Sequence, residues 1–387
     1  MSDETEEAKG PEIPNGARRV VGCMTGTSLD AVDAALVVIE GEGVKMKGVM
    51  HSYGSRDLGA LKPRLRAAAS GVPLPASEFA TLASELAKAH IEPIAEAIRD
   101  CPTDRADLIC LHGQTVFHQP PLSWQLINPA VVAHEFGCPV WHDLRAADLA
   151  CGGQGAPITP LADWVLLRAK GESRSVVNLG GFCNVTHLPD PEVAGIEAIR
   201  GGDVCACNHV LDAVARETIG EPFDKDGRMA LAGKPERGAV NDLRELLAPQ
   251  SGTGRSLGTG DEMEESIRAW IAGCKVTMAP QHIAASAVTA LVIVIGEQVK
   301  DSDCVLIAGG GCKNVALQQG LMASVVFEMD KVMMDTGVLG IPVGYREAAC
   351  FAVLAALCED GVPITLPRIT KGADPAPRAG SRTYIPK

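Results

Sequence analysis

Asp203 of this 387-residue chain has a setting that suits general-base chemistry. It follows Gly201 and Gly202 and precedes a helical pattern that begins near His209, so a tight turn would let its carboxylate project into a cleft. A carboxylate placed in this way can take a proton from a water molecule within hydrogen-bond reach. The alternative is an Asp that caps the next helix, but that helix begins too late for Asp203 to cap it.

One turn of small residues has the composition of a phosphate-binding loop, and a second turn that bears glycines resembles it in layout. The first runs from Thr25 to Ser28, between a strand rich in valine and the apolar run Val32–Ile39, and the second contains Gly180 and Gly181. Such turns bring backbone N–H donors and hydroxyls up to an anion. The first is not a Walker loop, because no Gly-Lys-Ser/Thr follows it. An ordinary hairpin remains open as an alternative there.

Two further polar segments follow buried strands. A strand over 303–308 runs into Gly309-Gly310-Gly311 and then a helix that begins near Asn314, which predicts an anion or nucleotide contact. A simple tight turn is the alternative for the three glycines. A short strand over 107–111 runs into the polar turn 112–115, and ligands bind at such strand ends in α/β sheets.

The elements that must position these residues are short strands and amphipathic helices. Three successive strands over 19–25, 32–39 and 44–53 predict an antiparallel start, and the stretch SVVNLGGFCNVTHL from Ser175 echoes it, which suggests a duplicated architecture. Apolar spacing predicts helices over 58–69, 75–100, 129–136, 161–170, 209–218, 279–300 and 347–357.

Composition narrows the class of protein. The formal net charge of −13 disfavours nucleic acid and anionic membranes as partners, so a charged substrate would need a local basic pocket. The 13 cysteines lack the paired spacing of a zinc site, and their odd number without a signal peptide suggests a reducing compartment. The longest apolar run, near 284–296, is shorter than a membrane span requires. We therefore expect a cytoplasmic location and no membrane partner.

The length of the chain suggests two domains. We expect a disordered tail over 1–17, domain I over 18–148 and domain II over 149–343. Residues 344–387 would form a helix and a tail that return to domain I, with a loose end after Gly372. Gly152 to Pro157 is a candidate hinge, because three glycines break the pattern there.

Assembled in order, these segments resemble the anhydro-N-acetylmuramic acid kinases and the related levoglucosan kinase. The resemblance runs from about Arg19 to about Thr365. Each segment alone is weak, but eight in the same order are specific. They are GTSLDAVD (26–33), HGQTVFH (112–118), DLRAADLACGGQGAP (143–157), NLGGFCN (178–184), GGD (201–203) with Asn208 and Asp212, FDKDG (223–227), GGGCKN (309–314) and REAACFA (346–352).

The resemblance implies a two-domain, α/β, actin/hexokinase-like (ASKHA, ribonuclease H-like) fold with ATP in the cleft between the domains. It also implies the reaction. Water opens a 1,6-anhydro sugar at C1, a carboxylate activates that water, and the oxygen released at C6 accepts the γ-phosphoryl group of ATP with the help of Mg²⁺. Family members commonly form homodimers.

The resemblance also implies roles for individual residues. Asp203 matches the base and a sugar contact. Glu347 matches a position linked to Mg²⁺. An equal alternative for Glu347 is a Glu in the first turn of a helix, where the helix dipole stabilises a negative charge. The matched sugar contacts are Asp30, Thr115, Asp143 and Arg145, the last two of which could instead form a structural ion pair. The matched nucleotide-binding positions are Gly26, Thr27, Ser28, Leu29, Asp30, Ala31, Val32, Asp33, Asn178, Gly180, Gly181, Gly309, Gly310, Gly311 and Asn314.

The chain departs from the family pattern just after the base. Where the family usually reads DTGPGN, this chain reads DVCACN, so Cys205 and Cys207 replace glycines. If those glycines held positive φ, each cysteine would cost roughly 1–2 kcal/mol. Ala31 replaces another usual glycine, and the two cysteines have no clear partners for a metal. Levoglucosan as the substrate, a binding protein that has lost turnover, and a kinase that acts without hydrolysis remain open as alternatives.

Overall fold

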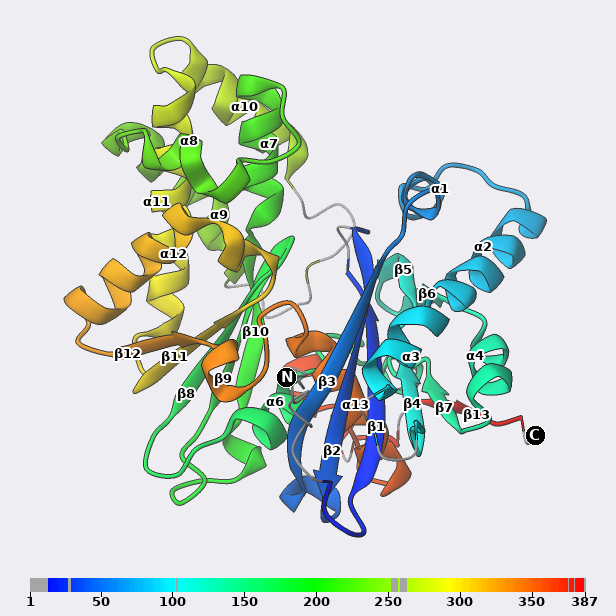
Figure 1. Cartoon of the computed structure of the whole chain (residues 1–387). Helices are drawn as coiled ribbons and strands as arrows, with labels where there is room; N and C mark the ends of the chain where they lie inside the picture. The colour runs from blue at the N-terminus through cyan, green and yellow to red at the C-terminus, as the bar shows by residue number, and fades with distance from the viewer. Residues whose placement is uncertain are drawn as a thin grey trace, which may run out of the picture.

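The computed structural model of the chain describes residues 13–26, 29–99, 101, 104–251, 257, 263–374, 376–378 and 380–385. Two β-sheets with helices around them form two lobes, which stand side by side in Figure 1. The first lobe is the six-stranded sheet with α1 to α4, and the second lobe is the five-stranded sheet with α7 to α12. Residues 1–12 of the tail predicted over 1–17 lie outside the described residues, and Ile13 packs against the core of the first lobe.

The sheet of the first lobe has the strand order β13-β7-β4-β1-β2-β3. β1 and β2 pair antiparallel, as do β2 and β3, whereas β4 runs parallel to β1 and β7 runs parallel to β4. A small antiparallel hairpin, β5 and β6, stands beside it. The strands are β1 Arg18–Thr25, β2 Ala31–Glu40, β3 Lys47–Asp57, β4 Leu108–Leu111, β5 Gln114–Gln119, β6 Leu122–Leu126, β7 Val140–His142 and β13 Ser381–Thr383.

The sheet of the second lobe repeats this plan, with the order β10-β9-β8-β11-β12. Its first three strands form an antiparallel meander, and β11 and β12 continue in parallel from β8. The same order of strands in both sheets confirms the duplicated ribonuclease H-like fold. The strands are β8 Arg174–Leu179, β9 Phe182–Leu188, β10 Arg200–Ala206, β11 Cys304–Ala308 and β12 Val332–Asp335.

Helices α6 (Pro160–Leu167) and α13 (Arg346–Glu359) join the two lobes. α13 packs on β1, β2 and β4, and α6 contacts α13, β3 and β9. One hydrophobic core contains Val20 of β1, Val176 of β8 and the buried face of α13, so both sheets share it. Gly22 permits this packing, because a Cβ there would lie 2.0 Å from the carbonyl oxygen of Ala348.

The remaining helices pack on the two sheets or on one another. α3 lies on β2 and β3, whereas α11 packs between α9, α8, α12 and α7 (Figure 1). α11 is long and apolar enough to cross a membrane by composition, but it is largely buried and serves as the core helix of the second lobe. These helices are α1 Leu61–Ala69, α2 Ala76–Ala89, α3 Ile91–Ile98, α4 Pro129–Phe136, α5 Ala146–Ala150, α7 Asn208–Ile219, α8 Arg228–Leu231, α9 Arg237–Ser251, α10 Glu264–Lys275, α11 Pro280–Val299, α12 Val315–Met322 and α14 Pro367–Thr370.

Three sequence expectations differ from the structure. The helix expected over 75–100 is two helices that meet at His90, whose ring Nδ1 bonds to the carbonyl oxygen of Leu86. The end expected to be loose after Gly372 contributes β13, which pairs with β7. Asp203 does not sit in a tight turn, because β10 runs through the two glycines and pairs with β9. The expected domain boundaries stay predictions.

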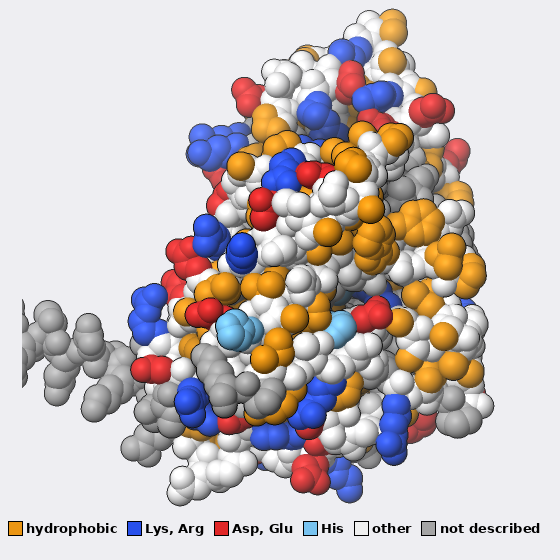
Figure 2. Space-filling view, turned by 90° about the vertical axis from the view of Figure 1, so that its right-hand side faces the viewer, with side chains coloured by type: hydrophobic (Ala, Val, Ile, Leu, Met, Phe, Trp, Pro, Cys, Tyr) orange, Lys and Arg blue, Asp and Glu red, His pale blue; other side chains and the backbone are white. Residues whose placement is uncertain are grey.

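The surface carries both signs of charge. Figure 2 shows one face, on which basic and acidic side chains are interspersed and hydrophobic side chains gather in part of the view. The exposed aromatic residues of the chain include Phe117 and Trp124 of the β5–β6 hairpin.

Candidate active site

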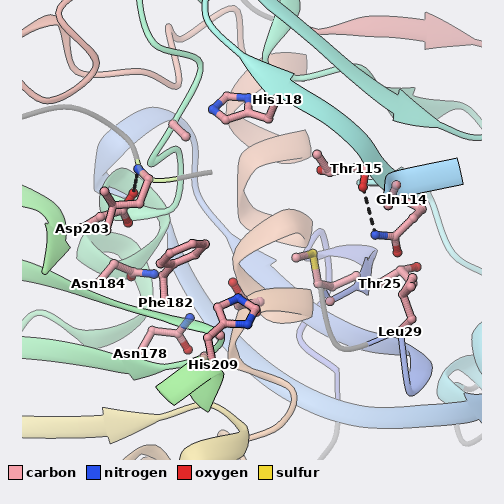
Figure 3. A pocket seen from close by; sticks show the side chains of 18 of the residues that line it. Thr25, Leu29, Gln114, Thr115, His118, Asn178, Phe182, Asn184, Asp203 and His209 are labelled. Carbon is pink, nitrogen blue, oxygen red and sulfur yellow. Dashed lines mark hydrogen bonds between the residues drawn. The ribbon is translucent and has the colours of Figure 1, made fainter. Parts of the chain in front are cut away.

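A cavity of about 650 Å³ lies between the two lobes. Figure 3 shows two groups of side chains that face each other across it, one from each lobe. Gly26, Thr115 and Arg145 line it from one side, and Asn178 and Asp203 line it from the other. Glu347 and Phe351 of α13 also line it. Predicted residues from distant parts of the chain therefore meet in one place.

Four buried polar atoms on the cavity wall have no hydrogen-bond partner among the described residues. They belong to two residues beside the predicted phosphate loops and two residues of the HGQTVFH segment. They are Thr25 Oγ1, Gln114 Oε1, His118 Nε2 and Asn178 Oδ1. Buried polar groups are nearly always paired in folded proteins. Polar atoms without partners around one cavity therefore indicate a polar ligand there.

Asp203 lies in the middle of β10, opposite Asn184 of β9. The pairing shifts between Asp203 and Cys205, and such a β-bulge can re-aim a side chain. One carboxylate oxygen, Oδ2, accepts a hydrogen bond of 2.6 Å from the backbone N–H of Leu257 (Figure 3). The strand and this bond fix the carboxylate at the cavity wall, where a base could act on a bound water molecule.

Arg145 is held at the cavity by backbone and side-chain acceptors. Its Nη1 donates to the carbonyl oxygen of Gly155 at 2.7 Å, and its Nη2 and Nε lie 3.0 and 3.3 Å from Nε2 of His112. The N–H of Gly155 in turn donates to the buried carboxylate of Asp148, which also accepts from Thr370. The glycine-rich segment predicted as a hinge therefore positions Arg145.

The ring of His112 acts as a neutral acceptor. Its Nδ1 lies 2.7 Å from the carbonyl oxygen of Gly113, so Nδ1 carries the proton and Nε2 is free to accept from Arg145. Burial and the charge of Arg145 lower the pKa of His112 to about 3. Burial also lowers the pKa of Arg145 to about 10, although the nearby charges of Glu347 and Asp203 oppose that shift. The guanidinium thus remains charged at neutral pH.

Glu347 lies in the first turn of α13 with its side chain at the cavity. Burial raises its pKa, and the charges of Arg346 and Arg145 partly offset that effect. Mg²⁺ in phosphoryl-transfer sites is usually held by one or two carboxylates together with phosphate oxygens and water. No cluster of three or more protein ligands is present in the described part of the chain, and one carboxylate beside a phosphate site fits this mode. The helix-dipole alternative fits the same position.

The first predicted phosphate loop is only partly described. Gly26 and Leu29 line the cavity, and the N–H of Leu29 donates to the carbonyl oxygen of Gly26. Thr27 and Ser28 lie outside the described residues. The other predicted positions of this loop lie outside the cavity lining: Asp30 pairs with Lys62, Ala31 and Val32 begin β2, and Asp33 accepts from Ser55 at 2.7 Å.

The second predicted phosphate loop closes the opposite side of the cavity. Gly181 lets the ring of His209 lie close, because a Cβ would be 2.6 Å from Nε2 of His209. Behind this loop lies Gly309, whose φ of 90° favours glycine. A Cβ on Gly309 would be 2.7 Å from Asn178 Oδ1. Gly310 and Gly311 follow it, and Asn314 caps α12 through the N–H of Leu317 at 3.0 Å. The role of these four residues in nucleotide binding stays a prediction.

The predicted sugar contacts separate into two groups. Thr115 lines the cavity and accepts from Gln125 at 3.2 Å. Asp143 is exposed, has a φ of 53° and lies outside the cavity lining. Asp143 and Arg145 form no ion pair among the described residues, so the structural alternative for them is wrong.

Cys205 and Cys207 are part of the hydrophobic core of the second lobe. Cys205 pairs with Cys183 across β9 and β10, and Cys207 has a φ of −120°. Neither has positive φ, so the strain considered for these positions is absent. Burial raises the pKa of the Cys207 thiol to about 12, which keeps it protonated. These two positions therefore act as small apolar residues in the core of the second lobe.

Sequence reasoning missed several residues of the cavity. They come from strands, from the loop between β4 and β5 and from helices, and only the fold shows which of their side chains face the cavity. His112 and His118 belong to the HGQTVFH segment, for which the sequence analysis assigns a role only to Thr115. Their place in that segment is the sequence feature that could have identified them. The missed residues include Arg66, His112, Gln114, His118, Phe182, Asn184, His209 and Arg216.

Comparisons with known proteins agree with the geometry. The family model described as "Anhydro-N-acetylmuramic acid kinase" matches residues 18–385. The protein of that name from Acidiphilium cryptum is 35% identical over 375 residues, covering 95% of this chain and 98% of the relative. The one from Salinibacter ruber is 34% identical over 385 residues, covering 91% and 93%.

Two solved structures show a more distant likeness. One is component A of the (R)-2-hydroxyglutaryl-CoA dehydratase of Acidaminococcus fermentans, with a TM-score of 0.43, 12% identity, and coverage of 88% of this chain and 98% of the other. The second is a ROK family glucokinase from Streptomyces griseus in complex with glucose and AMPPNP, with a TM-score of 0.38, 13% identity, and coverage of 87% and 99%. Both are too distant to identify a function.

Proposed function

We propose, because the chain belongs to the anhydro-N-acetylmuramic acid kinase family, that it uses ATP to convert 1,6-anhydro-N-acetylmuramic acid into the 6-phosphate of the opened sugar. The observation that carries this proposal is that Asp203 lines the same cavity as Gly26 and Gly180. A base and two phosphate loops in one cavity are the groups that the reaction needs.

The reaction consumes one water molecule and one ATP for each sugar. Asp203 takes a proton from the water molecule while the oxygen of that water bonds to C1 of the sugar. The bond between C1 and the bridging oxygen breaks, and that oxygen stays on C6. It then bonds to the γ-phosphorus of ATP while the bond from that phosphorus to ADP breaks. The products are the sugar 6-phosphate, ADP and one proton, which Asp203 releases to solvent.

The loops of the cavity would hold the phosphates. Phosphoryl transfer depends mainly on positioning and on neutralisation of charge. Backbone N–H groups near Gly26 and Gly180, the hydroxyl of Thr25 and the amide of Asn178 are suited to phosphate oxygens. We place Gly309 to Gly311 and Asn314 on the adenosine side. Glu347 is the residue that we assign to Mg²⁺, which would neutralise part of the phosphate charge there.

Arg145 and Thr115 would contact the sugar. The bonds of Arg145 to His112 and Gly155 fix its guanidinium before any ligand binds. Such pre-organisation lowers the cost of ordering a side chain on binding. Asp30 and Asp143 lie outside the cavity lining, so their assigned sugar contacts would need movement of the chain.

The test is a kinetic screen of the purified chain with ATP and two anhydrosugars. We expect phosphorylation of 1,6-anhydro-N-acetylmuramic acid, with a mass increase equal to one water and one phosphoryl group. Levoglucosan lacks both the N-acetyl group and the acidic side chain and should react with much lower kcat/KM. A mass increase by the phosphoryl group alone, or preference for levoglucosan, would contradict the proposal.

Location and assembly are also part of the proposal. All 13 cysteines are free, as is usual in reducing compartments, and we therefore propose a cytoplasmic enzyme. We propose a homodimer, which sedimentation of the purified chain tests.

A further inference from the structure

The acidic side chain of a muramic acid needs positive charge beside it. The end of the cavity where the reaction would occur, near Asp203 and Glu347, carries negative charge instead. A muramic acid carries a carboxylate on an ether side chain, and this substrate would enter a protein of net charge −13. Asp203 and Glu347 stand at the reacting end. A third carboxylate close to them would be repelled. The acidic group of the substrate should therefore point away from Asp203, toward positive charge.

Among the described residues three arginines line the cavity, and two of these are available for such a group. Arg145 is engaged with His112 and Gly155, and it lies in the field of Glu347 and Asp203. Arg66 and Arg216 are exposed, and neither forms an ion pair within the described ranges of the chain. Each stands in the last turn of its helix, where the dipole favours a cation.

These two arginines come from opposite lobes. Arg66 belongs to α1 and Arg216 to α7, which stand at the upper ends of the two lobes in Figure 1. Neighbouring residues of each helix, Ser70 after α1 and Ala213 in α7, also line the cavity. A ligand that reaches both arginines would bridge the lobes. Glu264 lines the same cavity but pairs with Arg268 at 2.7 Å, which reduces its opposing charge.

We infer that Arg66 and Arg216 bind the carboxylate of the substrate's acidic side chain and thereby select an acidic anhydrosugar over a neutral one. This inference rests on the proposed function. Arginine is suited to the role, because its planar guanidinium can donate two hydrogen bonds to one carboxylate. A ligand bound by both arginines would also link recognition to the two lobes, because Arg66 belongs to α1 and Arg216 to α7.

The test measures binding of two sugars by calorimetry. One sugar is 1,6-anhydro-N-acetylmuramic acid, and the other is 1,6-anhydro-N-acetylglucosamine, which lacks the acidic side chain. The chain is compared with Arg66→Gln and Arg216→Gln. Arg237→Gln is the matched control, because it removes one exposed positive charge outside the cavity. Far-UV spectra and melting curves show that each variant is folded.

We expect Arg66→Gln and Arg216→Gln each to weaken binding of the acidic sugar roughly 10- to 100-fold, the range for a hydrogen bond to a charged group. Binding of the neutral sugar and the KM for ATP should change less than about twofold, and Arg237→Gln should match the unmodified chain. Equal losses for both sugars, no loss for either, or a rise confined to the KM for ATP would overturn the inference. If the unmodified chain binds neither sugar, the proposed function fails and this inference fails with it.

Discussion

The buried ion pair between Arg346 and Asp163 offers a direct test of how the two lobes are joined. Arg346 begins α13, and Asp163 lies in α6. Their side chains are 1% and 0% exposed, and Nε of Arg346 donates to Oδ1 of Asp163 at 2.8 Å. A second bond joins Nη2 to Oδ2, and Cys350 Sγ lies 3.5 Å from Oδ1. Asp163 therefore neutralises a charge that water cannot reach.

Asp163→Ala should strongly reduce the free energy of unfolding. It leaves a buried guanidinium without its counter-charge, and the Nη1 atom of Arg346 already has no partner among the described residues. Breaking a buried pair on one side costs about 3–5 kcal/mol. That is a large part of the roughly 5–15 kcal/mol that stabilises a typical domain. The melting temperature should fall by roughly 6–20 °C.

Two comparison variants separate the charge effect from loss of packing. Asp163→Leu combined with Arg346→Met replaces both partners by apolar groups and should recover most of the loss, because no charge remains buried. Glu92→Ala breaks an exposed ion pair, in which the side chains of Glu92 and Arg56 are 67% and 47% exposed. This variant should lower the free energy of unfolding by less than about 1 kcal/mol. Urea titration and calorimetry measure all three. If Asp163→Ala lowers the free energy of unfolding by less than about 1 kcal/mol, the reasoning is refuted, because breaking an exposed ion pair has an effect of that size.

Two further predictions concern pH and close packing. Burial lowers the pKa of His90, His118 and His187 to about 4 each, below the ordinary 6.5, so their stabilising effect is complete above pH 6.5 and is lost as the pH falls toward 4. Each such histidine makes the free energy of unfolding fall as the pH falls from 6.5 to 4, and His90→Leu should reduce that slope by about 1.4 kcal/mol per pH unit. An unchanged slope would contradict this prediction. Gly22→Ala should destabilise the fold severely, since its Cβ would lie 2.0 Å from Ala348 O, whereas Gly238→Ala in α9 meets nothing within 4 Å and should stabilise slightly. Similar melting temperatures for these two glycine variants would contradict the packing argument.

Much of the fold follows from local sequence patterns. The Val-rich strands, the small-residue turns and the helix starts at Pro129 and Pro280 are strong local signals, and the structure has strands and helices there. The echo between the stretches that begin near Arg19 and near Ser175 predicted the duplication that the two sheets show. In these cases the spacing of apolar residues and the positions of glycine and proline predict the same secondary structure.

Other features depend on contacts between distant segments. Two glycines suggested a turn before Asp203, but pairing with β9 extends β10 through them. Arg145 takes His112 as its partner rather than Asp143, because β4, which ends just before His112, pairs with β7, which ends shortly before Arg145. Cys205 and Cys207 appeared to replace glycines in a strained turn, yet they pack in the core with negative φ at Cys207. Tertiary pairing decides each of these, and local sequence does not encode it.

The most direct test of the central claim is the kcat of Asp203→Asn with ATP and 1,6-anhydro-N-acetylmuramic acid. The amide keeps the size of the side chain but cannot accept the proton of the attacking water. We expect kcat to fall roughly 10²–10⁴-fold, the usual cost of losing a general base, while the affinity for ATP stays nearly unchanged. A variant that retains more than about a tenth of the original kcat would contradict the assignment of Asp203 as the base.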